Sequence, residues 1–478
     1  MQPADTRAAE RPLVVDLDGT LIRADLLIES CFALLSDAPL RLPAVLATLP
    51  HGRAALKAAL AAEVPLDVAG LPFNQDLLAL LRAERAQGRR IYLATASDAR
   101  YGRAVADELG LFDGVFASDG TTNLKGAEKA RVLCEAFGRG GFDYAGNSTA
   151  DLPVWQDAGA VLVVNASAGL LRTMARRFPD ATVITPNRPA ARDYIRALRP
   201  HQWLKNLLLL VPGFAAHRFD MPMVLASILA LISFSLCSSS VYLLNDLLDL
   251  RHDREHRSKR HRPFAAGRVD LRHGVAMLIA TLAGAIGIAL LLPLPFLVTL
   301  VCYIALTLAY SLVLKRRPIL DVITLAGLYG IRMVAGGAAA AVSLSPWLLA
   351  FSIFFFLCLA LVKRSTELVD RLDRGAADPP GRGYRLSDLT VLQTMAGAAG
   401  YVAVLVFILY INSPAVTGLY RASDWLWVIP GILLYWISRV LMLTHRGEMH
   451  DDPVVFAARD RTSLACAGLI AVVMLVSI

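Results

Sequence analysis

The spacing of apolar residues changes near residue 200 and divides the chain into two parts. Before this point apolar runs are short and polar helical segments separate them, as in a soluble domain. After it come nine apolar stretches, several close to the ~20 residues that a helix needs to cross a bilayer. They cover residues 204–217, 222–244, 274–291, 294–314, 319–341, 345–362, 391–412, 425–443 and 462–478. The pattern therefore predicts about nine transmembrane helices. The count is approximate because the first stretch is short and is interrupted by Pro212.

Basic residues in the loops between these stretches predict the orientation. The charged start of the chain lacks an apolar core of signal-peptide length, so the N-terminus is expected in the cytoplasm. The loops that nine spans then place outside contain only Arg218 and Arg421 as basic residues, and the inner loops contain the others. This bias is the positive-inside pattern of a multi-pass protein, which predicts the cytoplasmic (inner) membrane with the acid-rich loops facing the cytoplasm.

Composition supports the division and excludes some classes of function. Of the 478 residues, 56% are hydrophobic and 18% are charged, too apolar for one soluble domain and too charged for an entirely membrane-embedded chain. The net charge of +8 could indicate nucleic-acid binding, but in the second half most basic residues lie in loops between apolar segments, which argues against it. The six cysteines are scattered without a CxxC pair, so they indicate neither a zinc site nor a disulfide framework.

An acidic stripe ends the second apolar stretch. On a helix Asp246, Asp249 and Asp253 fall within about 60° of arc, and a basic segment follows that closes on the sequence RPFAAG at residues 262–267. Mg²⁺ prefers oxygen ligands and commonly bridges carboxylates to substrate phosphates. The stripe therefore predicts a site for Mg²⁺ and a diphosphate at the membrane surface. The alternative is a solvated loop with charged helix ends.

The first half carries phosphate chemistry. Residues 13–21 form a buried strand that runs into a loop, in which Asp16 and Asp18 point the same way and could bracket one phosphate. A second strand, residues 91–95, ends in the hydroxyl of Thr95. Lys125 and Lys129 follow, and then the sequence YAGNSTAD at residues 144–151.

In this order, these segments resemble the four motifs of the haloacid dehalogenase (HAD) superfamily over residues 11–165. The resemblance implies an α/β Rossmann-like domain, residues 1–190, with a small helical cap at about residues 26–75. It makes Asp16 the nucleophile and Asp18 the general acid and base. Thr95 would bind a phosphoryl oxygen, and Lys129, in preference to Lys125, would neutralise charge beside the nucleophile.

The same resemblance implies a Mg²⁺ site formed by Asp16, the backbone carbonyl of Asp18 and the last motif, which contributes Asn147 and Asp151. Asn147 stands where many members of the superfamily have an acid, so one negative charge is lost, although an amide oxygen can still bind Mg²⁺. Whether the domain turns over substrate or serves as a docking or regulatory module is left open.

The second half, residues 195–478, resembles the UbiA superfamily of intramembrane prenyltransferases, because its NDxxD stripe precedes an Arg-Pro-x-x-x-Gly segment. That superfamily binds a polyprenyl phosphate or diphosphate with Mg²⁺ in a central cavity of an all-α membrane domain. By match, the residues that hold Mg²⁺ and diphosphate would be Asn245, Asp246, Asp249 and Asp253, with Arg262 beside them.

Two departures point to one branch of that superfamily. The loop after the sixth span begins with KRSTEL at residues 363–368 where aromatic-substrate enzymes have an aspartate pair. The spacing from Tyr310 to Lys315 is one residue longer than usual. Together with the sequence RPHQWLKN at residues 199–206, these features look more like the decaprenyl-phosphate phosphoribosyltransferases.

That resemblance suggests a set of substrate contacts. Candidates for phosphate contacts near the cytoplasmic surface are Lys205, Lys315, Lys363 and Arg364, and the set also includes Tyr310 and Glu367. Anchoring by the positive-inside effect is the alternative for each lysine or arginine. Arg332 lies near mid-membrane without an obvious acidic partner in the spans, and a charge there usually faces a polar cavity. Asp451-Asp452-Pro453, before the last span, is interpreted as a capped loop.

Three hypotheses follow. In the first, the membrane half transfers 5-phosphoribose from phosphoribosyl pyrophosphate to a polyprenyl phosphate, with Mg²⁺ as cofactor, and the HAD domain removes the 5-phosphate. The second is prenyl transfer to an aromatic acceptor such as 4-hydroxybenzoate, with a separate or inactive HAD domain. The third, a transporter, is disfavoured because the acids cluster at one surface rather than within the spans. The isoprenoid length and a homo-oligomeric state are left open.

Overall fold

The computed structural model describes residues 11–184, 189–256, 259–375, 377–378, 383–413, 416, 420, 422–449 and 452–477; Arg421 and Asp451 fall outside them. The chain forms two compact units, which are described separately. The first contains Met1–Leu198 together with Tyr242–Leu278, and the second contains Arg199–Val241 together with Ile279–Ile478. The acidic stripe and the RPFAAG segment therefore belong to the same unit as the N-terminal α/β domain.

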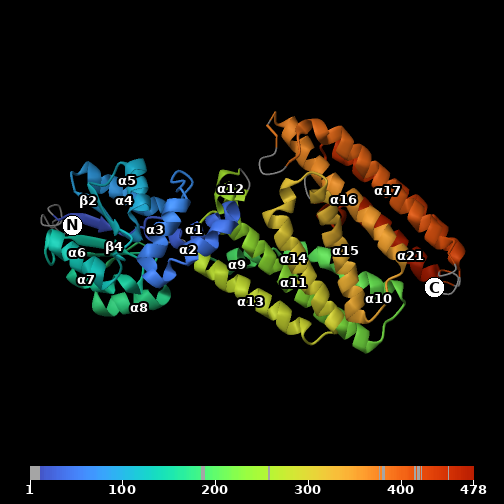
Figure 1. Ribbon diagram of the computed structural model, residues 1–478, viewed down its shortest axis with the longest axis horizontal. Helices are drawn as coiled ribbons and strands as arrows, with labels where there is room; N and C mark the ends of the chain where they lie inside the picture. The colour runs from blue at the N-terminus through green and yellow to red at the C-terminus, as the bar shows by residue number, and fades with distance from the viewer. Residues whose placement is uncertain are drawn as a thin grey trace. The chain divides into compact units, whose positions relative to one another are not determined.

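A six-stranded sheet forms the centre of the first unit (Figure 1). Its strands are β1 (Leu13–Val15), β2 (Ile91–Asp98), β3 (Gly114–Ser118), β4 (Asp143–Gly146), β5 (Val161–Val164) and β6 (Thr182–Ile184). The order is β3-β2-β1-β4-β5-β6 and every pairing is parallel, with Leu13 opposite Ile91 on one side and Asp143 on the other. Parallel sheets are covered on both faces, so the central strand β1 is entirely apolar and buried.

Successive residues of β1 point to opposite faces, and each face has its own helical layer. Leu13 and Val15 pack against apolar residues of α4 and α5, and Val14 packs against those of α6, α7 and α8. These helices are α4 (Gln75–Ala86), α5 (Ala99–Leu109), α6 (Ala127–Phe137), α7 (Leu152–Asp157) and α8 (Ala168–Arg177), and α9 (Ala191–Leu198) follows β6.

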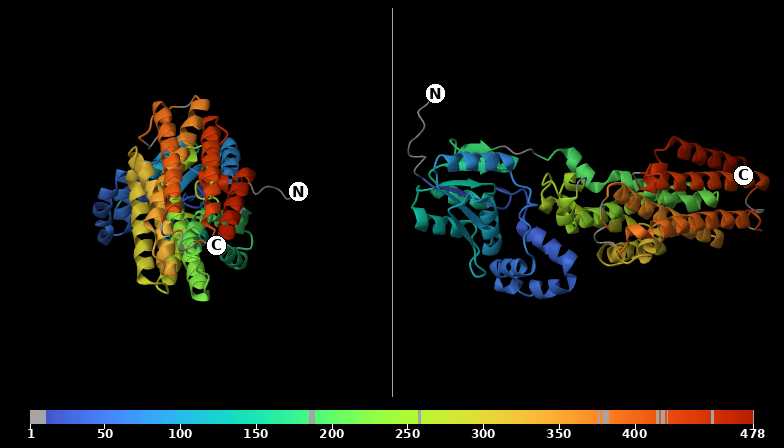
Figure 2. Two further views of the ribbon diagram at one scale, coloured as in Figure 1. Left: turned by 90° about the vertical axis from the view of Figure 1, so that its right-hand side faces the viewer. Right: turned by 90° about the horizontal axis from the view of Figure 1, so that it is seen from above.

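A group of short helices between β1 and β2 forms the predicted cap, drawn in blue beside the sheet in Figure 2. The group consists of α1 (Leu26–Asp37), η1 (Pro39–Arg41), α2 (Leu42–Leu46), η2 (Leu49–His51) and α3 (Arg53–Glu63). The predicted architecture, an α/β domain with a small helical cap followed by an all-helical region, is confirmed.

The rest of the chain is helical. Its longer helices are α11 (Met221–Leu248), α13 (Leu271–Ala289), α14 (Leu294–Leu312), α15 (Leu320–Ala340), α16 (Pro346–Asp373), α17 (Leu389–Ile411), α19 (Val428–His445) and α21 (Arg461–Ser477). Shorter segments are η4 (Pro200–Leu210), α10 (Val211–Ala215), α12 (Leu250–Glu255), η5 (Lys259–His261), η6 (Leu314–Arg316), η7 (Leu386–Asp388), η8 (Ser423–Trp427) and α20 (Pro453–Ala457).

Within the described residues, seven helices of this region are long and apolar enough to cross a membrane. The two other predicted spans fall short of that criterion. The first is divided between the 3₁₀ helix η4 and the five-residue α10, where Pro212 lies near the junction, and the last, α21, has 17 residues. The prediction of about nine spans was therefore approximate.

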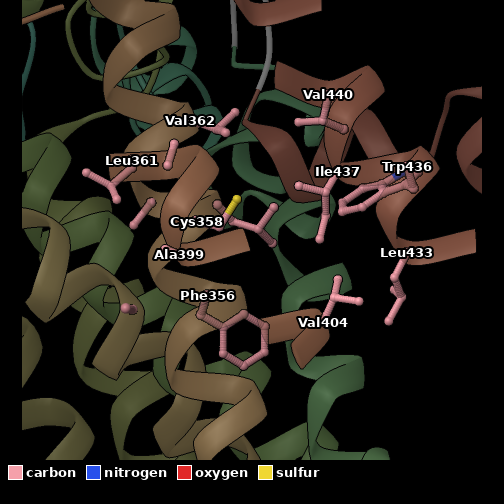
Figure 3. Close-up of a cluster of buried hydrophobic side chains, with 14 of the residues drawn as sticks. Phe356, Cys358, Leu361, Val362, Ala399, Val404, Leu433, Trp436, Ile437 and Val440 are labelled. Atoms are coloured by element: carbon pink, nitrogen blue, oxygen red, sulfur yellow. The ribbon is translucent and has the colours of Figure 1, made fainter. Parts of the chain in front are cut away.

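Neighbouring helices of the second unit share an apolar core. Side chains of α16, α17 and α19 converge in it, as Figure 3 shows for Phe356 and Cys358 of α16, Val404 of α17 and Ile437 of α19. Gly400 of α17 allows the close approach, because a β-carbon there would lie 2.7 Å from Cγ2 of Ile437. Small residues at contacts between membrane helices commonly serve this purpose.

Gly336 of α15 makes a tighter contact. A β-carbon at this position would lie only 2.0 Å from the backbone carbonyl oxygen of Leu209 in η4. Because the obstacle is backbone and not the end of a flexible side chain, η4 packs here only against a glycine.

Gly336→Ala should therefore lower the thermal unfolding temperature of the detergent-solubilised protein, since overpacking of this kind costs about 1 to 3 kcal/mol. Gly330→Ala is the matched control, because Gly330 lies on the same helix and a β-carbon there meets nothing within 4 Å. Equal unfolding temperatures for the two variants would contradict this account.

Candidate active sites

The first candidate site lies at the carboxyl ends of the central strands. Asp16 directly follows β1, Thr95 lies in β2, and Asn147 directly follows β4. Parallel α/β sheets commonly bind ligands at this edge, beside the point where the strand order reverses. The sheet order therefore brings together side chains that are more than 50 residues apart in the sequence.

Asp16 is the centre of this site. Its Oδ1 accepts a hydrogen bond from Lys129 Nζ at 2.7 Å, and its Oδ2 accepts one from the Thr20 hydroxyl at 3.0 Å. Lys129 also donates to the carbonyl oxygen of Ala94 and to the Tyr144 hydroxyl, both at 3.0 Å. Lys125 is exposed, so the structure places Lys129 and not Lys125 beside the predicted nucleophile.

Burial determines the electrostatics of the pair. It raises the pKa of Asp16, and Lys129 offsets a part of that increase. For the Lys129 ammonium burial acts in the opposite direction, but the carboxylates of Asp16 and Asp151 outweigh it and hold its pKa above the usual value. Lys129 is therefore positively charged and can neutralise an anion at Asp16.

Asp18 is held by hydroxyls and by a backbone amide. Its Oδ2 accepts hydrogen bonds from Ser97 Oγ at 2.6 Å and from Thr95 Oγ1 at 3.4 Å. Its Oδ1 accepts one from the backbone N–H of Leu26 at 2.8 Å, and burial raises its pKa. A raised pKa favours the protonated form that a general acid needs.

Ser97 was missed by the sequence analysis. The second strand extends to Asp98 rather than ending at residue 95, and alternate residues of a strand point to the same side, so Thr95 and Ser97 both reach Asp18. The alternation of hydroxyls in the sequence Thr95-Ala96-Ser97 was the signal that could have identified it. Lys57 of α3 was also missed; it donates to the carbonyl oxygen of Ala96 at 2.6 Å.

The last predicted motif contributes two different side chains. The Asn147 amide lies directly over Gly19, where a β-carbon would come within 2.1 Å of its nitrogen. Oδ2 of Asp151 accepts hydrogen bonds from the N–H groups of Asn147 and Ser148 and from the Ser148 hydroxyl, and its Oδ1 accepts one from Tyr144. Asp151 thus forms a capping box with Ser148 at the 3₁₀ turn Thr149–Asp151, and Asn147 is the side chain adjacent to the loop that follows Asp16 and Asp18.

These residues fit a divalent cation in part. Asp16, the backbone carbonyl of Asp18 and the Asn147 amide offer only oxygen donors, which suits Mg²⁺. Within the described ranges no group of three or more histidine, cysteine, aspartate or glutamate side chains is arranged to hold a metal. The roles of Asn147 and Asp151 as ligands therefore remain predictions.

The second candidate site is the acidic stripe. The backbone of Asp249, between the end of α11 and the start of α12, departs from α-helical angles, but helical hydrogen bonds continue from Asp249 N to Asn245 O at 2.9 Å and from Asp253 N to Asp249 O at 2.8 Å. Asn245, Asp249 and Asp253 thereby keep the spacing that places them on one face.

Arg262 of the RPFAAG segment joins two of the stripe's carboxylates. One guanidinium nitrogen of Arg262, Nη1, lies 3.1 Å from Oδ1 of Asp246 and 2.5 Å from Oδ2 of Asp253. Both aspartates are buried, and burial raises the pKa of Asp253 while Arg262 opposes that increase. Two buried carboxylates that converge on one cation form a site that fits Mg²⁺ in its donor chemistry.

A cluster of cations lies in the second unit. Lys205 of η4 and Lys363 of α16 both contact Oδ2 of Asp452, at 2.7 Å and 3.0 Å. The Tyr329 hydroxyl of α15 also donates to Asp452, at 3.3 Å. Sequence reasoning missed this role of Asp452, because the Asp-Pro pattern shows only its cap on α20 and its lysine partners are distant in the chain.

Arg332 is buried among neutral groups. It donates to the Asn206 amide oxygen at 3.0 Å, to the Tyr303 hydroxyl at 3.1 Å and to the carbonyl oxygen of Leu328. Its guanidinium carbon lies 5.0 Å from the centre of the Tyr303 ring and 5.9 Å from that of Phe234. In the described part of the chain none of its partners is acidic, so this charge in the middle of α15 has only neutral hydrogen-bond partners.

We call the group formed by Lys205, Lys363 and Arg332 the cation cluster. Among the described residues, its three basic side chains have one carboxylate partner between them, Asp452. Repulsion between like charges is strong where water is scarce. A bound anion would relieve this repulsion, so the cation cluster has the electrostatics of a phosphate site.

Arg364 has a different environment. All five of its N–H groups are accounted for by partners in the protein: Asp321 and Tyr310, and both carboxylate oxygens of Glu367 at 2.7 Å. Tyr310 also donates to Asp321, at 2.8 Å. The network ties α14, α15 and α16 together, and the predicted substrate roles of Arg364, Tyr310 and Glu367 would require these bonds to open.

Asp321, the fully buried partner in this network, was not identified from the sequence. Lys315 lies in η6, in the turn between α14 and α15, and its predicted phosphate contact stays a prediction.

Comparison with known proteins identifies both parts of the chain. The UbiA prenyltransferase family model matches residues 206–461, more than half of the chain, and the haloacid dehalogenase-like hydrolase model matches residues 13–156. An uncharacterized protein of Sinorhizobium fredii, y4nM, is 39% identical over 467 residues, which is 96% of this chain and 90% of that protein.

Two further similarities concern the membrane half. Decaprenyl-phosphate phosphoribosyltransferase of Mycobacterium tuberculosis is 40% identical over 183 residues, which is 36% of this chain and 59% of that protein. A solved structure of a UbiA homolog from Archaeoglobus fulgidus, bound to DMAPP and Mg²⁺, covers 59% of this chain and 98% of its own with 18% identity and a TM-score of 0.45. The chain is a multi-pass membrane protein that belongs to the UbiA prenyltransferase family and carries a haloacid dehalogenase-like hydrolase domain before its membrane helices.

Proposed function

We propose that the membrane half transfers a 5-phosphoribosyl group from phosphoribosyl pyrophosphate to a polyprenyl phosphate, and that the hydrolase domain then removes the 5-phosphate. The observation that carries the proposal is the cation cluster with its single carboxylate. Both substrates of this transfer carry phosphate, whereas in prenyl transfer to 4-hydroxybenzoate only the donor does and the acceptor brings one carboxylate. The similarity to decaprenyl-phosphate phosphoribosyltransferase supports the same reaction.

In the transfer step the bond between the anomeric carbon and pyrophosphate breaks, and a new bond forms from that carbon to a lipid phosphate oxygen. The lipid phosphate is already ionised, so no strong general base is needed. Asp246, Asp249 and Asp253 would hold Mg²⁺, and a bound ion would supply positive charge for the departing pyrophosphate. Lys205, Lys363 and Arg332 stabilise the negative charges of the two substrates.

In the hydrolysis step Asp16 attacks phosphorus, and the bond to the ribose 5-oxygen breaks. Asp18 protonates that oxygen as it leaves, and later takes a proton from the water that hydrolyses the aspartyl-phosphate. Lys129 neutralises charge at Asp16, and Thr95 and Ser97 hold Asp18 in position. The sequence of products is pyrophosphate first and inorganic phosphate second.

The distribution of basic residues between the loops supports a location in the cytoplasmic membrane, with the hydrolase and the acidic stripe facing the cytoplasm. Phosphoribosyl pyrophosphate is soluble and charged, so this orientation gives the donor direct access to the acidic stripe. Prenyl transfer from a polyprenyl diphosphate to an aromatic acceptor is the competing function, favoured by the family's name as prenyltransferases.

The donor can be identified directly. Membranes that contain the protein should convert labelled phosphoribosyl pyrophosphate and polyprenyl phosphate into a labelled lipid, and EDTA should abolish the reaction. Asp246→Asn should reduce the rate about 100-fold or more, since even outer partners of metal ligands cost about 10- to 100-fold. Asp270→Asn is the control, because Asp270 is exposed in the same loop region. Product from labelled prenyl diphosphate and 4-hydroxybenzoate instead would refute the donor assignment.

The cation cluster predicts a change in donor affinity. Lys363→Gln should raise the KM for phosphoribosyl pyrophosphate about tenfold or more, because a hydrogen bond to a charged group contributes about 1.5 to 3 kcal/mol. Arg374→Gln removes an exposed charge at the end of the same helix and should leave KM unchanged. A KM equal to that of the wild type in Lys363→Gln would remove the cation cluster from the donor site.

The two reactions should also separate by mutation. Asp16→Asn is expected to abolish release of inorganic phosphate from the lipid-linked phosphoribose while pyrophosphate release continues, because only the hydrolase loses its nucleophile. Asp119→Asn, an exposed position in the same domain, should retain both activities. Phosphate release that persists in Asp16→Asn would overturn the hydrolase assignment.

A further inference from the structure

Helix α1 of the cap packs against the segment that carries the acidic stripe. Both belong to the first unit, although more than 200 residues separate them in the sequence. Ile28 and Phe32 of α1 contact an apolar cluster that is contributed by α9, the end of α11, α12 and the RPFAAG region. Its buried members are Ala197, Leu243, Leu247, Leu250, Phe264, Val269 and Leu271.

Ion pairs flank this apolar contact. Arg254 of α12 makes a two-pronged contact with Glu29 of α1, at 2.6 Å and 3.0 Å, and each side chain is only 7% exposed. Arg272 of α13 contacts Oδ2 of Asp25, the residue before α1, at 2.6 Å and 3.0 Å. Two-pronged arginine–carboxylate pairs fix orientation as well as distance, so the buried Arg254–Glu29 pair defines how α1 lies on the loop. Both nitrogens of the more exposed Arg272 meet one oxygen of Asp25, which adds a second point of attachment at the start of α1.

The glycine of the RPFAAG segment lies in the same contact. Gly267 has a φ of +61°, and a β-carbon there would lie 2.9 Å from the backbone oxygen of Arg23 and 3.0 Å from Cβ of Pro72. The backbone of this loop therefore packs directly on the segment that follows the Asp16–Asp18 loop. A larger residue at position 267 would push the two surfaces apart.

The contact leads to the hydrolase site through a short series of hydrogen bonds. Arg272 holds Asp25, and Oδ1 of Asp25 caps α1 by accepting from the N–H of Ile28 at 3.2 Å. The first residue of the helix, Leu26, donates its N–H to Oδ1 of Asp18 at 2.8 Å. The position of the Asp18 carboxylate therefore depends on where the start of α1 is held.

We propose that Arg254 and Arg272 of the membrane half are positioning residues of the hydrolase site, which they support by fixing α1 and, through Leu26, the carboxylate of Asp18. The carboxylates that the two arginines contact are Glu29 and Asp25, not Asp16 or Asp18, so their effect on the site is indirect. Arg254 directly follows Asp253, the stripe carboxylate that contacts Arg262, so α12 supports both sites. The proposal rests on the hydrolase activity proposed above and extends it to residues outside the domain.

The test uses the full-length protein in detergent, with p-nitrophenyl phosphate as the hydrolase probe and hydrogen–deuterium exchange of residues 26–37 as a measure of α1 docking. Arg254→Ala and Arg272→Ala should each lower kcat about tenfold to a hundredfold, the scale expected for a displaced catalytic group, with KM nearly unchanged. Both should speed amide exchange in α1. Arg260→Ala, an exposed arginine in the same loop, is the matched control and should change neither.

Conservative variants separate positioning from a loss of folding. Arg272→Lys keeps a cation opposite Asp25 and should recover most of the kcat that Arg272→Ala loses. The double variant Glu29→Arg with Arg254→Glu exchanges the two charges and should recover part of the kcat that Arg254→Glu alone loses. Wild-type kcat and wild-type exchange of α1 in both alanine variants would overturn the proposal. The two proposals can fail separately. Equal hydrolysis of the probe by the wild type and Asp16→Asn would refute the hydrolase assignment. Unchanged amide exchange of α1 in Arg254→Ala and Arg272→Ala would refute the claim that these arginines hold α1.

Discussion

The cost of burying charge away from water constrains both units of this protein. A buried ion needs a partner of opposite charge or a bound ligand, because the low-dielectric interior stabilises it poorly by itself. Lys129 with Asp16 and Arg262 with Asp246 meet this need within the protein. The cation cluster has only one carboxylate partner, Asp452, among the described residues. This shortage of negative charge distinguishes it from the Arg364 network, in which every guanidinium N–H has a partner.

Local sequence patterns predicted much of the fold. The apolar run at residues 13–15 with its two following aspartates indicated a buried strand, and the α/β fold around it was implied by the resemblance to the haloacid dehalogenase superfamily. Apolar length indicated the seven helices that are long and apolar enough to cross a membrane. Length failed at the first span, which is divided between the 3₁₀ helix η4 and the short α10 with Pro212, and at α21, whose 17 residues fall about three short of the ~20 needed to cross a bilayer. Register and helix geometry at these places depend on neighbours that the sequence pattern does not reveal.

The candidate sites were predictable where partners are close in sequence or follow a known order of motifs. Lys129 beside Asp16 and the spacing of the acidic stripe are of this kind. Asp452 and Asp321 were not predictable, because each is defined by partners on other helices far along the chain. Asp452 caps α20 and Asp321 lies in the first turn of α15, and these local roles do not reveal their contacts with Lys205 and Arg364.

The adjacency of Asp253 and Arg254 restricts how this protein can change in length. Consecutive residues of a helix point about 100° apart, which lets one short helix present a carboxylate to Arg262 and a guanidinium to Glu29. Inserting or deleting a single residue in α12 would rotate both side chains away from their partners together. Natural relatives that keep both halves should therefore tolerate substitutions on the remaining faces of α12 far better than any change in its number of residues.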